Sequence, residues 1–202
     1  MKIDMHVHSI YSGDSTLEPR EMIKKAKEIG LDAICITDHH SFIASQFVED
    51  VARKENFKIF RGAEYHSEWG HVLIYGVYDD NFNSGRYLPI QEIIDKIQKE
   101  GGVVVPSHPY HRGYSRYLGD NIFKLKNLYA METYNARRTD EENNLAQKAS
   151  VMLKLPGIGS SDAHSVEELG RAYTVFQDHI SNIKELVTAL KRGRFKPEVA
   201  KI

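Results

Sequence analysis

The sequence predicts an α/β protein, more specifically a small, distorted (β/α)7-type barrel with a metal site at the carboxyl ends of its strands. Short apolar or alternating segments typical of strands are separated by longer segments in which apolar residues recur at helical spacing. Strands that alternate with helices form parallel sheets with right-handed crossovers. A chain of 202 residues is at the short end for such a barrel, so an open doubly wound sheet is the alternative.

The first part of the chain is predicted to form two strand and helix pairs. Apolar and polar side chains alternate over residues 3–7, which is typical of a strand. Pro19 suits a first helical position, and the apolar residues after it follow helical spacing until Gly30 ends the helix. Residues 33–37 form the apolar run of a buried parallel strand, and residues 41–54 carry the apolar stripe of a second helix.

A hairpin is expected to interrupt this alternation. Residues 58–64 and 71–78 resemble strands joined by a tight turn at Trp69 and Gly70. A further helix begins at Pro89 and ends at Gly101.

The remaining elements continue the pattern to the end of the helix at residue 192. They are predicted as strands over 103–106 and 128–133, a helix over 140–153, strands over 156–161 and 172–176, and a helix over 180–192. No linker, repeat or low-complexity tract divides the sequence, so residues 1–202 are expected to form a single domain.

The composition excludes several classes of protein. A balance of 27 Lys and Arg against 28 Asp and Glu gives a net charge of -1, which does not favour nucleic acid as a partner. One cysteine excludes a disulfide framework. No segment resembles a signal peptide or a membrane span, so we expect a cytoplasmic protein. The ten histidines stand out and require an explanation.

Most of the unusual polar residues directly follow predicted strands. They are His6, His8, Asp38, His39, Glu64, His108, Glu132, Asp162 and His164. His71 begins its strand, but in an antiparallel hairpin that position lies beside the end of the neighbouring strand. Because α/β proteins build their sites at the carboxyl ends of strands, we expect these side chains to converge.

Each motif alone also has a structural explanation. His6 and His8 occur in a pattern that serves packing as often as metal binding, Asp38 suits a helix N-cap, and Asp162 suits an Asx turn. Together, so many imidazoles and carboxylates would be costly to desolvate without a positive charge, which metal cations commonly supply. Imidazole and carboxylate ligands without thiolates favour Zn, Mn or Fe.

The order of these motifs resembles the polymerase and histidinol phosphatase (PHP) family, a distorted barrel of metal-dependent phosphoesterases related to the amidohydrolases. The matching stretches are 4–9 (DMHVHS), 11–14 (YSGD), 36–39 (ITDH), 62–64 (GAE), His71, 107–109 (SHP), 132–135 (ETYN) and 161–164 (SDAH). The resemblance extends over essentially the whole chain. It implies a single PHP domain with three divalent metal ions.

The resemblance also implies which residues hold each metal. The three expected ligand sets are His6, His8, Glu64 and Asp162 for the first metal, Asp14, His39 and His164 for the second, and Glu64, His71 and His108 for the third. Glu64, Asp162 and His164 are the expected catalytic residues. Asp38 and Glu132 are expected to orient imidazoles, although either could instead be a ligand.

A phosphate monoester of a small metabolite or nucleotide is the expected substrate, hydrolysed by a hydroxide that the metals activate. Arg112, Arg116, Arg137 and Arg138 are candidates for phosphate contacts, of which two are expected to be ordinary surface residues. Asn135 is a further candidate. His40, which stands where many relatives have an acidic or small polar residue, could face substrate or solvent. The short segment 41–62 leaves no room for the lid insertion of the nucleotide-degrading relatives.

Aromatic side chains in the loop after His108 could stack against a ring of the substrate or could simply pack. They are Tyr110, His111, Tyr114 and Tyr117. His66, His111 and His179 are otherwise interpreted as surface or core residues.

Three other activities stay open. A nuclease that acts on the end of an oligonucleotide would use the same metal centre, and a carbon–nitrogen hydrolase is the nearest rival in chemistry. The third alternative is a non-catalytic metal-binding or scaffold module. Nothing in the sequence indicates an oligomeric state.

Overall fold

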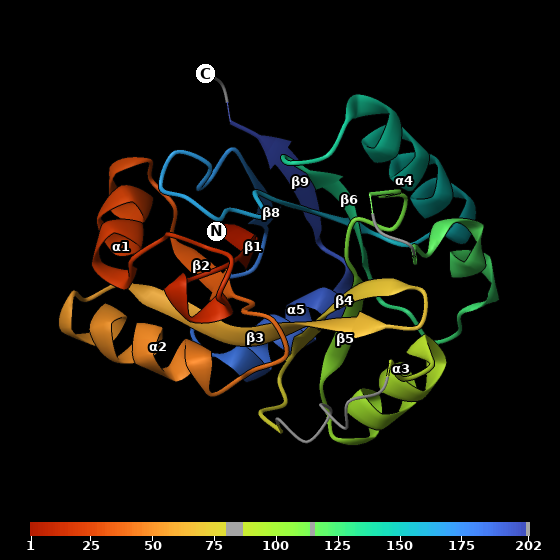
Figure 1. Ribbon diagram of the computed structural model, residues 1–202, viewed down its shortest axis with the longest axis horizontal. Coiled ribbons are helices and arrows are strands. Elements are labelled where there is room, and N and C mark those ends of the chain that lie inside the picture. The colour runs from red at the N-terminus through yellow and green to blue at the C-terminus, as the bar shows by residue number, and fades with distance from the viewer. Residues whose placement is uncertain (80–86, 114–115, 201–202) are drawn as a thin grey trace.

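The computed structural model describes residues 1–79, 87–113 and 116–200, and it has a mixed α/β architecture (Figure 1). The strands are β1 Lys2–Val7, β2 Ala33–Ile36, β3 Lys58–Ser67, β4 Gly70–Tyr75, β5 Val103–Pro106, β6 Met131–Asn135, β7 Gly157–Ser160, β8 Ala172–Phe176 and β9 Phe195–Val199. The helices are α1 Pro19–Glu28, α2 Ala44–Lys54, α3 Ile90–Lys99, α4 Asp140–Leu153 and α5 Ile183–Arg192, with 3-10 helices η1 Ile10–Ser12 and η3 Gly119–Lys124.

Seven strands form one sheet in the order β5-β4-β3-β2-β1-β8-β9, and β6 pairs with β7 in a second sheet. The pairs β1–β2, β2–β3 and β6–β7 are parallel. The pairs β3–β4, β4–β5, β1–β8 and β8–β9 are antiparallel. The antiparallel pair β3–β4 is the predicted hairpin, whereas the expectation of a parallel sheet is wrong for β4–β5 and β1–β8. β4 runs opposite to β1, β2 and β3, and β5 runs with them beside it, while β8 runs opposite to β1.

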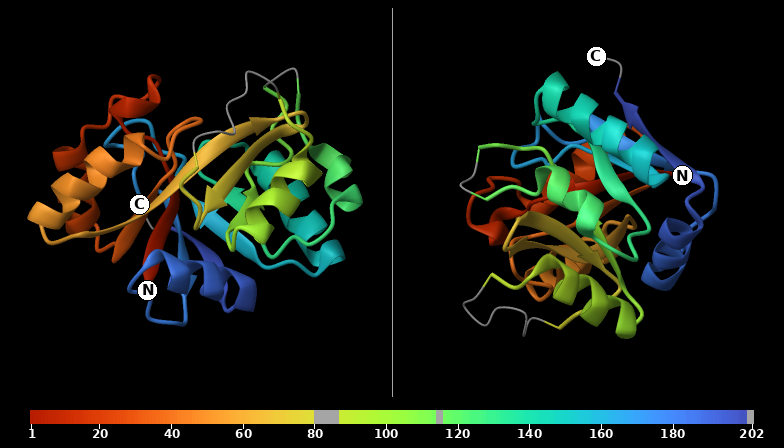
Figure 2. Two further views of the ribbon diagram at one scale, coloured as in Figure 1. Left: turned by 90° about the horizontal axis from the view of Figure 1, so that it is seen from below. Right: turned by 90° about the vertical axis from the view of Figure 1, so that its right-hand side faces the viewer.

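The large sheet curls towards the small one. The long β3 runs from beside α2 across to the side of the molecule where α3 lies (Figures 1 and 2). β7 packs against β1, and β5 packs against β6, so the first seven strands surround a common centre. No ladder joins the two sheets among the described residues, apart from an isolated bridge between Val7 and Ala163. The α/β class is thus confirmed, and the sheet is curled as in a barrel, but the described strands do not form a regular closed barrel.

The helices cover the outside of the curled sheet. α1 and α2 pack together beside β3, α3 and α5 pack on β5, and α4 packs on β6 (Figure 1). Thr139 and Glu142 form a capping box that begins α4 where the sequence predicts it. None of the helices in the described part of the chain has the length and apolar character required to span a bilayer.

A few element boundaries differ from those predicted. α2 begins at Ala44 and α5 at Ile183, three residues later than predicted in each case, and β3 continues to Ser67. β9 is not predicted at all, because Pro197 argues against a strand unless it lies at the edge of a sheet, as β9 does. The four isoleucines of α3 and Cys35 in β2 are buried as expected.

Candidate metal centre

Glu64 lies buried in β3 at the centre of the polar cluster. Its Oε2 atom lies 3.4 Å from Nε2 of His6 and 3.4 Å from Nε2 of His8. Oδ1 of Asp162 also lies 3.4 Å from each of these nitrogens, and the two nitrogens are 2.9 Å apart. We call His6, His8, Glu64 and Asp162 the inner group, because two imidazoles and two carboxylates converge there without solvent.

The donor atoms of the inner group fit a shared cation. Nδ1 of His6 lies 3.2 Å from Oε1 of Glu132, which keeps a proton on Nδ1 and directs the lone pair of Nε2 at His8 and the carboxylates. Ligand atoms of His6, His8 and Glu64 all lie within 4.8 Å of one another, a spacing that one cation could share, and Asp162 lies beside the two imidazoles. Ligands about 2.1 Å from a tetrahedral ion lie about 3.4 Å apart, close to the separations between the nitrogens and oxygens here.

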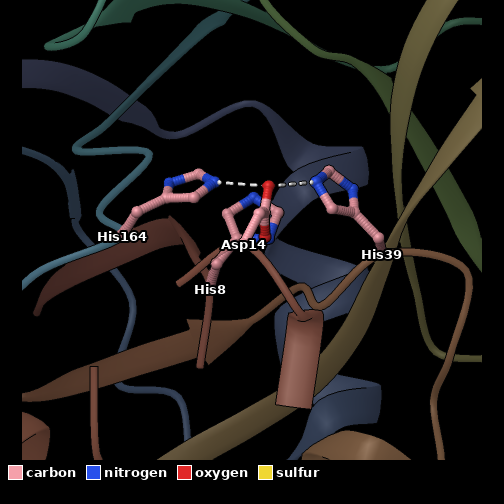
Figure 3. Close-up of side chains that lie close together, drawn as sticks. All are labelled: His8, Asp14, His39 and His164. Atoms are coloured by element: carbon pink, nitrogen blue, oxygen red, sulfur yellow. Dashed lines mark hydrogen bonds and ion pairs between the residues drawn. The ribbon is translucent and has the colours of Figure 1, made fainter. Parts of the chain in front are cut away.

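The outer group consists of Asp14, His39 and His164 (Figure 3). Oδ2 of Asp14 lies between the two rings, 3.1 Å from Nε2 of His39 and 3.2 Å from Nε2 of His164. One ligand atom from each of these residues and from His8 lies within 4.8 Å of the others. The inner and outer groups therefore meet at His8, whose ring also lies beside Asp14 in Figure 3.

The lateral group consists of Glu64, His71 and His108, on the other side of the same carboxylate. Oε1 of Glu64 lies 3.0 Å from Nδ1 of His71 and 3.1 Å from Nε2 of His108. Ser107 also donates its hydroxyl to this oxygen at 3.1 Å. The two oxygens of Glu64 thus face different sets of imidazoles, since Oε2 also lies 3.3 Å from Nδ1 of His39.

Glu132 in β6 connects the inner and lateral groups. Besides its contact with His6, it accepts hydrogen bonds from the backbone N–H of His108 at 2.5 Å, from Asn135 Nδ2 at 3.1 Å and from the Ser160 hydroxyl. This agrees with the expectation that Glu132 orients an imidazole. Asp38 instead accepts the backbone N–H and the hydroxyl of Ser9 at 2.6 and 2.7 Å.

Asp4 is a buried carboxylate that sequence reasoning did not assign to the site. It accepts the backbone N–H groups of Ser161 at 2.9 Å and Gly170 at 3.0 Å. Burial raises the pKa of Asp4 to about 6, although these hydrogen bonds lower it. Asp4 therefore holds the loop that presents Asp162 against the end of β1.

The charges of the inner group are strongly coupled. Burial opposes ionisation of every member, but the carboxylates of Asp162 and Glu64 raise the pKa of His6 well above its ordinary value. Hydrogen bonds to the same two carboxylates raise the pKa of His8 to about 9 against the effect of burial. Conversely, the imidazoles hold the pKa values of Glu64 and Asp162 far below those of ordinary carboxyl groups despite burial. The imidazoles and carboxylates of the inner group thus favour each other's charged forms.

The outer group behaves differently. Burial lowers the pKa of His39 to about 4, and burial together with the charge of His8 lowers the pKa of His164. Burial would raise the pKa of Asp14, but His39 and His164 lower it. The surroundings of the outer imidazoles thus favour their neutral form, which is the form that binds metal.

Three residues of the site have left-handed backbone conformations although none is glycine. Their φ angles are 55° for His40, 26° for His108 and 55° for Asp162. Side chains other than glycine seldom adopt this region, and such residues concentrate at functional sites. The contacts of the surrounding residues therefore stabilise an unfavourable backbone conformation at these three positions.

The structure brings three of the predicted substrate-binding residues to the metal-ligand candidates. Nη1 of Arg137 lies 2.6 Å from Nδ1 of His164. Nη2 of Arg138 lies 3.6 Å from Oδ2 of Asp162, and Nδ2 of Asn135 donates to the same oxygen at 3.1 Å. Arg137 and Arg138 thus lie on different sides of the loop that carries Asp162 and His164.

The other predicted contacts lie farther out. Arg112 is exposed, and its backbone N–H donates to Glu142 at 3.2 Å. Arg116 stacks over the Tyr87 ring at 4.5 Å, and Tyr114 lies outside the described residues. The His40 ring lies 6.4 Å from that of His39 and so borders the centre.

His66 is a neighbour of the centre that sequence reasoning interpreted as a surface or core residue. Its ring stacks on His71, with 3.9 Å between centroids and 7° between planes, and lies 4.5 Å from the His40 ring. The available signal was its spacing: two residues after Glu64 in the same strand, it lies on the same face. Ser107 could have been recognised as the residue that precedes His108 at the end of β5.

Comparison with known proteins agrees with this geometry. A family model described as PHP-associated matches residues 140–195. An uncharacterised protein of Methanocaldococcus jannaschii is 30% identical over 167 residues, which make up 77% of this chain and 94% of that protein. A Thermotoga maritima protein named "Probable histidinol-phosphatase" is 36% identical over 55 residues, which make up 27% of this chain and 24% of that protein.

Among solved structures, a two-domain protein of Bacteroides vulgatus matches with a TM-score of 0.76 and 19% identity. It is described as containing a predicted PHP-like metal-dependent phosphoesterase, and the match covers 98% of this chain but only 64% of that one. The chain is therefore a member of the PHP family of metal-dependent phosphoesterases.

Proposed function

We propose that this chain hydrolyses a phosphate monoester in a reaction that depends on divalent metal ions. The observation that carries the proposal is the inner group, in which ligand atoms of His6, His8 and Glu64 lie within 4.8 Å of one another and Asp162 lies 3.4 Å from both imidazoles. Membership of the PHP family supports phosphoester chemistry. We also propose that residues 1–202 form a single PHP domain.

The inner, outer and lateral groups would each hold one ion of Zn, Mn or Fe, whose imidazole and carboxylate preferences they match. When bound, the ions supply a water of lowered pKa and screen negative charge on the phosphate. Glu64 would face all three groups, Asp162 would complete the inner group, and His164 would complete the outer one. These three residues would contact the reacting atoms most directly and are our candidate catalytic residues.

Arg137 is the best candidate for a direct contact with the phosphate. Its side chain is 35% exposed beside His164, whereas that of Arg138 is 11% exposed beside Asp162. A guanidinium at the open side of the outer group can form bidentate contacts with an incoming phosphate. Arg138 and Asn135 would instead hold Asp162 in place. Arg112 and His40 would contact the remainder of the substrate.

A monoester is a better match than a polynucleotide. Binding a chain of phosphates requires several cationic contacts, whereas the whole protein has a net charge of -1. The similarity to a protein named as a histidinol-phosphatase points in the same direction. An oligonucleotide is nevertheless included in the experiment below as the competing substrate.

The experiment combines metal analysis with a substrate panel. We expect purified protein to contain up to three equivalents of Zn, Mn or Fe, and to hydrolyse phosphate monoesters in a manner that chelation abolishes and Mn or Zn restores. His8→Ala should lose metal and activity, whereas His179→Ala, which alters an exposed histidine outside the three groups, should lose neither. Metal-loaded protein that hydrolyses none of the monoesters would overturn the proposal, and hydrolysis of the oligonucleotide alone would establish the nuclease.

A further inference from the structure

Two aromatic side chains lie exposed beside the outer group. Tyr11 is 46% exposed and Phe47 is 54% exposed, and their ring centroids are 5.2 Å apart with 37° between the planes. Ile43, at 57% exposed, extends the apolar surface along the turn that leads into α2. Large apolar side chains usually contribute to a core, so three exposed ones in neighbouring segments mark a contact surface.

The position of this surface is fixed by the same turn that organises the outer group. Tyr11 lies in η1, and the next residue, Ser12, has its hydroxyl 2.9 Å from Nδ1 of His8. The Ser12 hydroxyl also accepts the backbone N–H of His39 at 3.1 Å. Asp14 follows two residues later, and three residues of chain span at most about 11 Å. The backbone of Tyr11 therefore lies no farther than this from that of Asp14, which is a separation that a nucleotide can span.

We propose that Tyr11 and Phe47 bind the base of a nucleoside monophosphate whose phosphate lies at the metal centre. This proposal rests on the phosphoesterase function proposed above and narrows its substrate class. Base and aromatic ring stack with little dependence on base identity, which suits an open pair of rings rather than an enclosed pocket. The net charge of -1 favours a mononucleotide over a polynucleotide.

The first test measures binding to chelator-treated protein, so that it does not depend on catalysis. Calorimetric titration with AMP, adenosine and ribose 5-phosphate separates the contribution of the base from that of the phosphate. We expect AMP and adenosine to bind, ribose 5-phosphate to bind at least about fivefold more weakly than AMP, and Phe47→Ala to remove this difference. Phe47→Trp should retain it. Val151→Ala, which shortens an exposed apolar side chain on α4, is the matched control and should behave as wild type.

The second test uses metal-loaded protein with AMP, ribose 5-phosphate and a short oligonucleotide. We expect Phe47→Ala to lower kcat/KM for AMP about tenfold through KM and to leave ribose 5-phosphate unchanged. Equal AMP kinetics in Phe47→Ala and wild type, or a matching loss with ribose 5-phosphate, would overturn the base-binding role. A change of oligomeric state in Phe47→Ala would assign the surface to a protein interface, and a loss confined to the oligonucleotide would assign it to a polynucleotide. Failure of the phosphoesterase proposal is distinct, because then neither monoester is hydrolysed by any variant.

Discussion

The inner and outer groups use the same kinds of side chain in opposite surroundings. The side chain of Asp162 in the inner group is 4% exposed, whereas that of Asp14 in the outer group is 48% exposed. His6 and Glu64 lie in strands β1 and β3, and His8 and Asp162 follow the ends of β1 and β7, while Asp14 and His39 lie in loops. The inner imidazoles have raised pKa values and the outer ones have lowered pKa values.

The difference in burial between the inner and outer groups predicts that an ion in the inner group would be held more firmly than one in the outer group. Under the metal-dependent function proposed above, an ion in the inner group would leave only as protons replaced it, because buried carboxylates require positive charge. In the outer group Asp14 is exposed and the two imidazoles are half-buried, so an ion held there would exchange at smaller cost. The predictions below test that contrast.

The largest effect is expected from Glu64→Gln. The change removes the charge that faces the inner, outer and lateral groups while it preserves the size of the side chain. We expect metal affinity at the inner and lateral groups and phosphoesterase activity to fall by more than about a hundredfold, which exceeds the usual effect of a residue that only orients a ligand. Metal analysis after dialysis provides the measurement. Retention of all three ions would contradict the central role of Glu64.

A smaller and more local effect is expected from Asp14→Asn. The variant should lose about one equivalent of metal and keep the ions of the inner and lateral groups, because Asp14 contacts only the outer imidazoles among the described contacts. Graded chelation of wild-type protein should remove the same ion first. If Asp14→Asn releases all the metal together, the two groups are not separable and the comparison fails.

Glu132→Gln tests whether the inner group depends on the proton that Glu132 holds on Nδ1 of His6. A neutral amide can present its nitrogen to the ring and is a weaker acceptor, so we expect metal affinity of the inner group to fall about 10- to 100-fold. The outer ion should be retained. Asp38→Asn offers a matched control, since Asp38 is also buried but contacts Ser9 rather than an imidazole.

The smallest effect is expected from Glu142→Gln, which acts on the support of the lateral group. Glu142 closes the capping box of α4 and lies 2.9 Å from Nδ1 of His111, in the loop that follows His108. We expect the free energy of unfolding of the metal-free protein at pH 7 to fall by about 1 kcal/mol. Metal stoichiometry should not change.

The difference in the free energy of unfolding between wild type and Glu142→Gln is also expected to depend on pH. Although burial opposes it, hydrogen bonds from Thr139 and His111 lower the pKa of Glu142 from 4.5 to about 2. A lowered carboxyl pKa stabilises the fold above the unfolded value and ceases to do so as pH falls through the folded value. Chemical unfolding should therefore show the gap between wild type and Glu142→Gln closing between pH 4.5 and pH 2. A gap that stays constant would show that the charge of Glu142 is not responsible.

Most residues of the polar cluster could be predicted from the sequence, because they lie in or directly after predicted strands. His6 and His8 share a strand face, and His108 and Asp162 directly follow strands, so simple periodicity predicts that they converge. Three clusters of candidate ligands lie together in the structure: His6, His8 and Glu64; His8, Asp14, His39 and His164; and Glu64, His71 and His108. The contacts of Asp4, Ser107 and His66 were not predicted, because small or isolated polar residues carry no signal until their neighbours are known.

Strand direction was the main point at which prediction from sequence failed. The apolar run of β5 looks alike whether it pairs in parallel or antiparallel, because burial on both faces erases the alternation that would distinguish the two. β8 alternates buried and half-buried residues, but its short sequence does not give the direction of its partner. β9 was also not predicted. It contains Pro197, which a strand accommodates at the edge of a sheet, where β9 lies.

The sequence by itself determined the kinds of side chain in the centre and the family to which the chain belongs, because metal ligands must be particular residues at particular distances from strand ends. Only the tertiary structure decided that Glu64 lies between all three groups, that Glu132 rather than Asp38 orients an imidazole, and that one group is buried while another is exposed. These properties depend on contacts between residues far apart in the chain, and burial, which sets the pKa values and the cost of losing an ion, is a property of the folded molecule as a whole.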